Sequence, residues 1–384
     1  MENLAVTVAY IGETKGKGLL ASRDIKAGEV IMQERPIVCC QFSWNAAYNY
    51  LACDYCMRSL ESTEDNVRRL TCKADLVLPF PECCPTSKDR QTKCPACGIQ
   101  YCSEDCKQEA WKRYHMTLCT GTQGQNPSHP LVVLNEAWKQ MHYPPETTSI
   151  ILLARIIAMV RQAEDKAAVV NTFMQFCHRT VNEEQEIAHK LLGDQFSGQL
   201  EVLRELTSKA VYSDEVQHWL TPQGFQSLIA LVGTNGQGVG TSPLAQWVNN
   251  VSNLELSPDQ RKAIDLFIDG VYEELENVAG GFLDAEGSGL YVLQSACNHD
   301  CEPNAEQTFP LGDSTLVLKA KRDISQGEEI CVSYLDECAL SRSRHSRSKI
   351  LKENYLFICH CNKCLSQAGD DSETSEDEDL SEDD

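Results

Sequence analysis

Short alternations of apolar and polar residues near both ends of the chain predict β-strands. Residues 4–50 alternate in this way and are interrupted at Gly18 and Gly28, which is typical of short strands joined by turns. Strand character returns from about Gly281 to Tyr334. A short helix, a last group of cysteines and an acidic tail finish the chain. The pattern predicts an α+β protein.

Between the two strand regions, apolar residues recur at helical spacing. The stretch PPETTSIILLARIIAMVRQAEDKAAVVNTFMQFC opens on Pro144 and Pro145, and residues 183–211 and 257–278 have the pattern of further amphipathic helices. The most apolar window, residues 150–160, is too short to cross a membrane and carries Arg155 at its centre. We therefore expect a helical middle region and no contact with a membrane.

A nine-residue pattern occurs twice. RDIKAGEVI (23–31) and RDISQGEEI (322–330) share R-D-I-x-x-G-E-x-I, and each predicts a strand, a glycine turn and a second strand. Two interpretations stay open: convergent hairpin chemistry, or two halves of one β domain that the middle of the chain splits.

The 20 cysteines change the expected chemistry. No secretory signal precedes them, so we expect a reducing compartment, cytoplasmic, nuclear or both, where clustered cysteines bind metal more often than they form disulfides. The stretch SRSRHSRSK (341–349) is the nearest candidate for a nuclear import signal, but a basic helix near the active site explains it better.

The net charge of −22 indicates which partners to expect. Ten of the acids lie in residues 370–384, a low-complexity tail too polar to fold, and the rest of the chain still carries −12. Such a surface repels nucleic acid and attracts basic proteins.

Regular cysteine spacings predict metal sites. Two CxxC pairs, a CxxxC pair and an HxxxC pair supply eight soft ligands, enough for two closed tetrahedral zinc sites, whereas buried free thiols rarely show such spacing. The ligands are Cys53, Cys56, Cys94, Cys97, Cys102, Cys106, His115 and Cys119. The long insert between the first two pairs holds three further cysteines, Cys72, Cys83 and Cys84, which are spare ligands or loop cysteines.

A second group, Cys359, Cys361 and Cys364, lacks a fourth ligand. His360 lies between two ligands, so its participation would strain the geometry. A distant thiol such as Cys301 is the better candidate.

Four ordered segments resemble the signatures of SET-domain lysine methyltransferases: KGKGLLA, GLYVLQSACNHDCEPNA, GEEICVSYLD and YLFICHCNKC. The cysteine spacing between them resembles a MYND zinc finger, so the chain is similar to the SET–MYND family over nearly its whole length. The resemblance implies a split β-rich SET domain with a pseudoknot, an inserted MYND finger, a helical insertion and a post-SET zinc site.

The implied boundaries are 1–50 for the N-terminal SET part, 51–120 for the finger with its insert, 121–280 for the helical linker and SET insertion, 281–336 for the SET catalytic core, 337–366 for the post-SET segment and 367–384 for a disordered acidic tail.

The resemblance also implies roles for individual residues. Cys53, Cys56, Cys102 and Cys106 would hold one zinc; Cys94, Cys97, His115 and Cys119 a second; and Cys301, Cys359, Cys361 and Cys364 a third. Tyr334 would be catalytic. The residues implied to contact S-adenosylmethionine (SAM) are Lys15, Gly16, Lys17, Gly18, Asn235, Asn298, His299, Tyr334, Tyr355 and Phe357. For Lys15 and Lys17 a solvated turn is the alternative, and for the aromatics core packing.

Two features depart from the family pattern. Asn235 lies in GTNGQGVGT (233–241), which lacks the Lys-Ser/Thr of a phosphate loop, and its alignment with a SAM-contacting asparagine is loose. Asp300 stands where the family usually has serine.

The implied function is methyl transfer from SAM to a lysine of a basic protein, such as a histone tail or a ribosomal protein, by a monomer with three structural zinc ions. One alternative is a catalytically weak scaffold that binds proline-rich partners through the finger. The other is a zinc-dependent nucleic-acid binder, which the interleaved acids of the finger helix and the overall charge disfavour.

Overall fold

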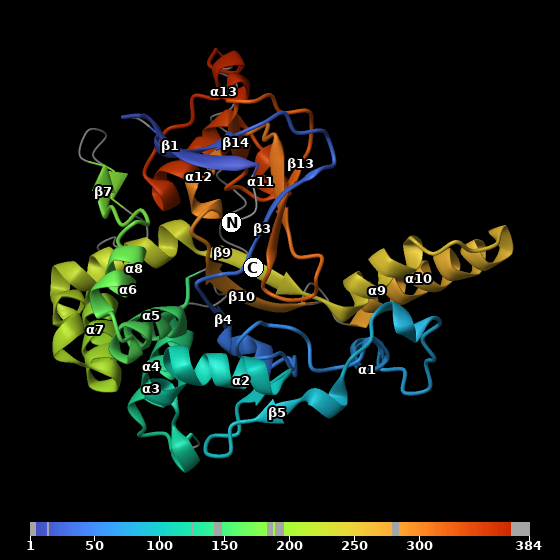
Figure 1. Cartoon of the computed structure of the whole chain (residues 1–384), viewed down its shortest axis with the longest axis horizontal. Coiled ribbons are helices and arrows are strands. Elements are labelled where there is room, and N and C mark those ends of the chain that lie inside the picture. The colour runs from blue at the N-terminus through green and yellow to red at the C-terminus, as the bar shows by residue number, and fades with distance from the viewer. Residues whose placement is uncertain are drawn as a thin grey trace.

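Most of the strands come from the two ends of the chain, and five short ones, β5 to β9, come from its middle (Figure 1). The structure, a computed structural model, describes residues 5–13, 15–124, 126–141, 148–182, 187–188, 196–278 and 284–369. The predicted tail from residue 370 onward lies outside the described residues. The strands are β1 (Val6–Gly12), β2 (Gly16–Ala21), β3 (Val30–Glu34), β4 (Val38–Gln41), β5 (Thr92–Lys93), β6 (Gln100–Tyr101), β7 (Val181–Asn182), β8 (Ile187–Ala188), β9 (Gln237–Thr241), β10 (Ala285–Leu290), β11 (Asn298–His299), β12 (Ala305–Thr308), β13 (Leu316–Ala320) and β14 (Glu329–Val332).

Three small sheets combine strands that are far apart in sequence. Their orders are β1-β2-β14-β11, β4-β10-β9 and β12-β13-β3, so each sheet joins N-terminal and C-terminal strands. Leu19, Ile31, Leu318 and Ile330 are buried in one apolar cluster between these strands. The two strand regions of the sequence therefore form one β unit.

The repeated nine-residue motif lies at the centre of this unit. Its two copies pair at Ile25 and Ile324, whose backbones exchange hydrogen bonds of 2.9 Å in both directions. The contacts are nearly reciprocal: Asp24 accepts from the backbone of the second copy and Asp323 from that of the first. The repeat is thus the seam of a split β domain and not an accident of hairpin chemistry.

Helices α3 to α8 form the body at the left of Figure 1. The helices are α1 (Thr63–Thr71), α2 (Glu104–Ala110), α3 (Met116–Leu118), α4 (Pro130–Met141), α5 (Ile150–Gln162), α6 (Lys166–Phe173), α7 (Ser197–Val211), α8 (Pro222–Asn235), α9 (Pro243–Ser252), α10 (Pro258–Val278), α11 (Glu337–Ser341), α12 (Arg344–Tyr355) and α13 (Asn362–Ser366). Ser149 caps α5, whose side chains are mostly buried, so α5 is the central helix of this layer.

Two helix predictions need correction. The stretch 144–177 contains two helices, because Asp165 caps a new helix, α6, after α5 has ended at Gln162. Of the stretch 183–211 the structure describes residues 187–188 and 196–211, and α7 begins at Ser197. Before it, residues 181–182 and 187–188 pair as short strands, and the Asn182 side chain donates to Leu356 O at 2.8 Å. The helix prediction is therefore wrong at residues 187–188, and its remaining part before residue 196 lies outside the described residues.

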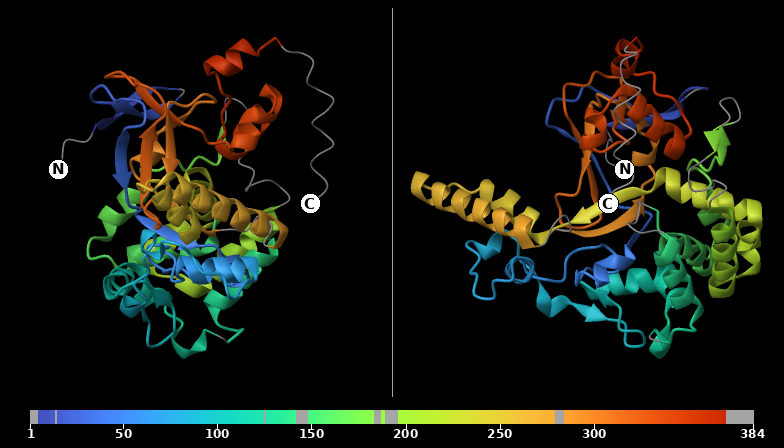
Figure 2. Two further views of the ribbon diagram at one scale, coloured as in Figure 1. Left: turned by 90° about the vertical axis from the view of Figure 1, so that its right-hand side faces the viewer. Right: turned by 180° about the vertical axis from the view of Figure 1, so that it is seen from behind.

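A helical arm of α9 and α10 projects from the β9–β10 hairpin, as Figure 1 and the right-hand view of Figure 2 show. It packs against the finger insert, which contains α1. Trp247 is fully buried there and donates to the carbonyl oxygens of Pro79 and Phe80 at 3.0 Å. The two insertions thus share one apolar cluster.

The insert cysteines belong to that packing. Cys83 and Cys84 are buried in the apolar cluster, and Cys72 is exposed just after α1. None of the three joins a group of possible metal ligands among the described residues, and their interpretation as loop cysteines stays a prediction.

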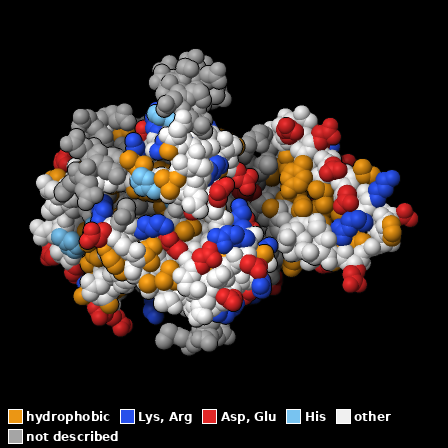
Figure 3. Space-filling model, turned by 90° about the horizontal axis from the view of Figure 1, so that it is seen from above, with side chains coloured by type: hydrophobic (Ala, Val, Ile, Leu, Met, Phe, Trp, Pro, Cys, Tyr) orange, Lys and Arg blue, Asp and Glu red, His pale blue; other side chains and the backbone are white. Residues whose placement is uncertain are grey.

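The surface of the arm mixes apolar and acidic side chains (Figure 3). Leu266 is 63% exposed, and Asp265, Asp269 and Glu273 are exposed on the same helix. Among the described residues, no helix has the length and apolar character needed to span a membrane.

Candidate functional site

The first thiol cluster of the finger is compact. Cys53, Cys56, Cys102 and Cys106 place their four sulfur atoms within 4.8 Å of one another. Cys102 Sγ lies 3.6 Å from Cys56 Sγ and 3.5 Å from Cys106 Sγ. Tetrahedral zinc with Zn–S bonds of about 2.3 Å needs sulfur atoms roughly 3.8 Å apart, so the cluster fits one zinc ion.

The second cluster joins Cys94, Cys97, His115 and Cys119. Cys94 and Cys119 have their sulfur atoms 3.8 Å apart, and His115 Nε2 lies 3.4 Å from Cys97 Sγ. His115 is buried at the end of a π-helical turn, Trp111–His115, which directs its ring toward the thiols. The alternating ligand pairs implied by the finger resemblance are thus brought together.

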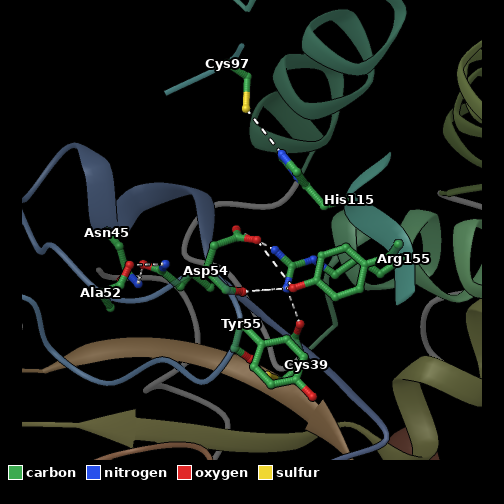
Figure 4. A network of polar contacts seen from close by, with 10 residues as sticks. Cys39, Asn45, Ala52, Asp54, Tyr55, Cys97, His115 and Arg155 are labelled. Carbon is green, nitrogen blue, oxygen red and sulfur yellow. Dashed lines mark hydrogen bonds and ion pairs between the residues drawn. The ribbon is translucent and has the colours of Figure 1, made fainter. Parts of the chain in front are cut away.

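A buried arginine joins the finger to the rest of the protein (Figure 4). Arg155 Nη2 donates to Asp54 Oδ1 at 2.6 Å, and Nη1 donates to the carbonyl oxygens of Asp54 and Cys39 at 2.8 and 2.5 Å. Asp54 follows the first zinc ligand, and Cys39 lies on β4. The arginine that interrupts the most apolar stretch of the sequence therefore holds finger, sheet and α5 together.

The third cluster contains Cys301, Cys359, Cys361 and Cys364. Cys301 Sγ lies 3.6 Å from Cys364 Sγ, and a hydrogen bond from Cys359 lowers the pKa of Cys301 to about 3. His360 is exposed and outside the cluster. The fourth ligand is thus the distant thiol, 58 positions before Cys359, and this cluster also fits one zinc ion.

Four rings gather beside this third cluster. The ring of Tyr334 lies 4.7 Å from that of Tyr355, 6.2 Å from that of Phe357 and 5.5 Å from that of His299, measured between centroids. The Tyr334 hydroxyl donates to Cys297 O at 2.7 Å. Burial raises the pKa of Tyr334, so its hydroxyl stays protonated and can both donate and accept hydrogen bonds.

A polar group forms the neighbouring wall. Glu329 accepts from Lys15 Nζ at 2.6 Å and from Asn298 Nδ2 at 2.8 Å, and Asn298 also donates to Lys17 O at 2.8 Å. Lys17 Nζ points to Gln175 O instead, at 3.3 Å. Sequence reasoning missed Glu329. The repeated motif could have indicated it. The first copy has Val30 where the second copy has Glu329, so the carboxylate is a departure from the shared pattern.

The two glycines of the first motif serve different purposes. Gly16 has φ +68° with open space where a Cβ would lie, so the conformation requires glycine. At Gly18 a Cβ would lie 2.6 Å from Ile11 Cδ1, so the requirement is close packing. The open, positive-φ turn at Gly16, the polar wall and the rings together make up the candidate cofactor cradle, and their contact with a cofactor stays a prediction.

Asn235 lies at the edge of this cradle but is already engaged. Its amide nitrogen donates to Cys177 O at 2.7 Å and to Leu231 O at 2.8 Å, and its oxygen accepts from Cys177 N at 3.3 Å. The segment after α6, which sequence reasoning also missed, is therefore held between Asn235 and Lys17. The predicted contact of Asn235 with a cofactor stays a prediction.

A well-formed cavity lies elsewhere in the described part of the chain. It has a volume of about 520 Å³ and opens between the finger, its insert and the SET strands. Tyr55, Arg35, Arg58 and Arg90 are among its lining residues. The size is typical of ligand pockets.

Known proteins match this architecture. The SET domain family model matches residues 16–335. The chain is 55% identical to "Protein-lysine N-trimethyltransferase SMYD5" of Gallus gallus and 54% identical to that of Homo sapiens, in each case over 97% of this chain and 89% of the relative. It is 26% identical to "Histone-lysine N-methyltransferase SMYD3" of Mus musculus, over 75% of this chain and 52% of that protein. The family resemblance of the sequence motifs is confirmed, including the similarity to SET and MYND domain-containing protein 5. The chain therefore belongs to the SET-domain family and, within it, to the group of SMYD5 proteins.

Proposed function

We propose that this chain transfers methyl groups from SAM to a lysine of a basic protein, and that it can add three. The observation that carries the proposal is the ring cluster around Tyr334, adjacent to the polar group of Lys15, Asn298 and Glu329. The names of the SMYD5 relatives support lysine as the target and three as the number of methyl groups.

SAM supplies an electrophilic methyl group on a sulfonium. In an in-line transfer the N–C bond forms as the S–C bond breaks, and the amine loses a proton to solvent, so the chain must chiefly align the reactants. A lysine amine has an ordinary pKa of about 10.4. The apolar walls of Tyr355 and Phe357 disfavour the charged form of the amine. The protonated Tyr334 hydroxyl orients the amine.

Lys15 would hold the carboxylate end of SAM, and Asn298 and His299 would hold the rest through β11. Glu329 keeps Lys15 and Asn298 in place. We assign the twelve Cys and His ligands to three structural zinc ions. These sites are closed, so they stabilise the fold and take no part in the chemistry.

Transfer of tritiated SAM into fractionated cell extract by zinc-loaded protein tests the proposal. Tyr334→Phe should abolish a labelled band while keeping SAM binding and zinc content. Tyr272→Phe is the matched control, because Tyr272 is exposed on the arm far along the chain from the site. Equal labelling by Tyr334→Phe and wild type would refute the role of Tyr334.

A second candidate function is partner binding at the finger cavity. Its volume of about 520 Å³ and the aromatic side chain of Tyr55 support binding of a proline-rich peptide segment there. Tyr55→Ala should weaken peptide binding, measured by fluorescence anisotropy, and leave methyl transfer unchanged. Loss of both properties would mean that the variant disturbs the finger itself.

The proposal extends to the remaining properties of the protein. The charge of −22 supports a basic protein substrate and argues against direct nucleic-acid binding. We propose a monomer that works in the cytoplasm, the nucleus or both, without membrane contact. Light scattering and cell fractionation test these points.

A further inference from the structure

We propose that the side chain of His299 is a positioning residue that couples the third zinc cluster to Tyr334. Through it, zinc at Cys301 would fix the backbone of the tyrosine at the site of methyl transfer. The inference rests on the proposed function, because it assigns a purpose to the link between a structural cluster and the catalytic tyrosine.

Two hydrogen bonds of one imidazole carry the argument. His299 Nδ1 lies 3.0 Å from Tyr334 N, and His299 Nε2 lies 3.3 Å from Cys301 Sγ. The backbone N–H of Tyr334 can only donate, so Nδ1 must accept. In a neutral imidazole the proton is then on Nε2, which donates to the sulfur of Cys301. The ring is 6% exposed, so water does not compete strongly for either nitrogen.

The place of His299 in the sheet explains why it reaches both partners. Strands β11 and β14 run parallel and pair His299 with Val332. Tyr334 lies two residues beyond that pair, where the ladder has ended. The imidazole continues the pairing by accepting the Tyr334 N–H, and Cys297 O accepts the Tyr334 hydroxyl at 2.7 Å. The two residues that flank Asn298 thus hold both ends of the tyrosine.

The cluster side of the link has a second donor. Arg347 is fully buried, and its Nη2 lies 3.6 Å from Cys364 Sγ. It also interacts with Cys301 and donates to Arg342 O and Gln367 Oε1, at 2.6 and 2.7 Å. Four thiolates around one Zn²⁺ carry an excess of negative charge, and N–H donors to the sulfur atoms stabilise it. Both donors therefore favour the ionised, metal-binding form of the cluster, but only His299 also contacts Tyr334.

Two amide substitutions separate the two contacts. In His299→Asn the side-chain amide ends near the position of Nδ1, so its oxygen can accept the Tyr334 N–H while Cys301 loses its donor. In His299→Gln the amide reaches the position of Nε2, so it can donate to Cys301 while the Tyr334 N–H loses its acceptor. Arg347→Lys is the comparison variant that affects the cluster without touching Tyr334.

Two measurements on the zinc-loaded full chain need no methyl transfer. The first is the rate at which each of the three zinc ions moves to a chelating dye. His299→Asn and Arg347→Lys should accelerate one of the three by about 10-fold or more, and His299→Gln should change it little. The second is hydrogen–deuterium exchange of the Tyr334 amide by mass spectrometry. It should be faster in His299→Gln and near wild type in zinc-loaded His299→Asn.

Coupling itself is tested in the wild type. Chelation that removes the zinc ion of the third cluster should accelerate exchange at the Tyr334 amide, and added zinc should restore protection. Equal zinc release in all variants, or an unchanged Tyr334 amide in His299→Gln, would overturn the inference. Because neither readout uses methyl transfer, an inactive wild type would refute the proposed function and leave this test intact.

Discussion

Arg155 should be among the most important single side chains for stability, because it joins three parts of the protein. Its side chain is 5% exposed and forms an ion pair of 2.6 Å with Asp54, whose side chain is 17% exposed. It also donates to Tyr114 and to the carbonyl oxygens of Cys39 and Asp54. Arg155→Met keeps the length and apolar stem of the side chain but removes the charge and the donors.

The expected cost follows from what the substitution leaves behind. Removing one member of a buried ion pair costs about 3–5 kcal/mol, because the other charge stays buried without a partner. Asp54 keeps some contact with water, which places Arg155→Met near the lower end, at about 3 kcal/mol. In a double-mutant cycle, Asp54→Asn with Arg155→Met should cost less than the sum of the two single changes.

Urea unfolding of the zinc-loaded protein measures this effect, with zinc content determined for each variant. Lys26→Met is the matched control, since its ion pair with Asp323 has a similar length, 2.8 Å, but both side chains are exposed. For Lys26→Met we expect no resolvable change in the free energy of unfolding. If the free energy of unfolding of Arg155→Met fell by less than about 1 kcal/mol with zinc retained, the Asp54 carboxylate would be adequately solvated without the arginine. The expectation of a buried, unpaired charge would then be wrong.

Four further substitutions test other parts of the structure. Gly16→Ala should lower the free energy of unfolding by about 1–2 kcal/mol because Gly16 has a positive φ, and Gly18→Ala by about 1–3 kcal/mol because the added Cβ would meet Ile11. Thermal unfolding measures both changes. An unchanged stability in either variant would contradict the reason given for it. Trp247→Ala should lower the free energy of unfolding by about 3–5 kcal/mol and make the finger insert sensitive to trypsin. Trp111→Ala, at an exposed position, should do neither. Equal digestion of the two variants would disprove the shared core. Burial raises the pKa of Asp284, so its contribution to wild-type stability is complete below about pH 3.9 and is lost as pH rises through the folded-state pKa. Asp284→Asn should therefore stabilise the protein at neutral pH but not in acid, and urea unfolding at both pH values measures this. A gain in stability at low pH alone would show that the folded-state pKa of Asp284 is lowered and not raised.

The sequence by itself determined the chemistry that depends on local spacing. Ligand pairs such as Cys53 and Cys56 must lie close along the chain to share an ion, so the finger was predictable residue by residue. The aromatic residues Tyr334 and Tyr355 followed from motifs. Alternation and periodicity gave strands at the ends and helices in the middle, because burial of one face imposes those periods.

Only the tertiary structure decided how these pieces meet. Nothing local indicates that Arg155 would pair with Asp54 across 101 positions, or that His299 would contact a thiol on one side and Tyr334 on the other. Glu329 and Asn235 acquired their partners from segments far along the chain. Local interactions are set by neighbours in sequence, whereas a buried polar group must find its partner wherever the fold brings one within about 3 Å, and that choice is made by the packing of the whole chain.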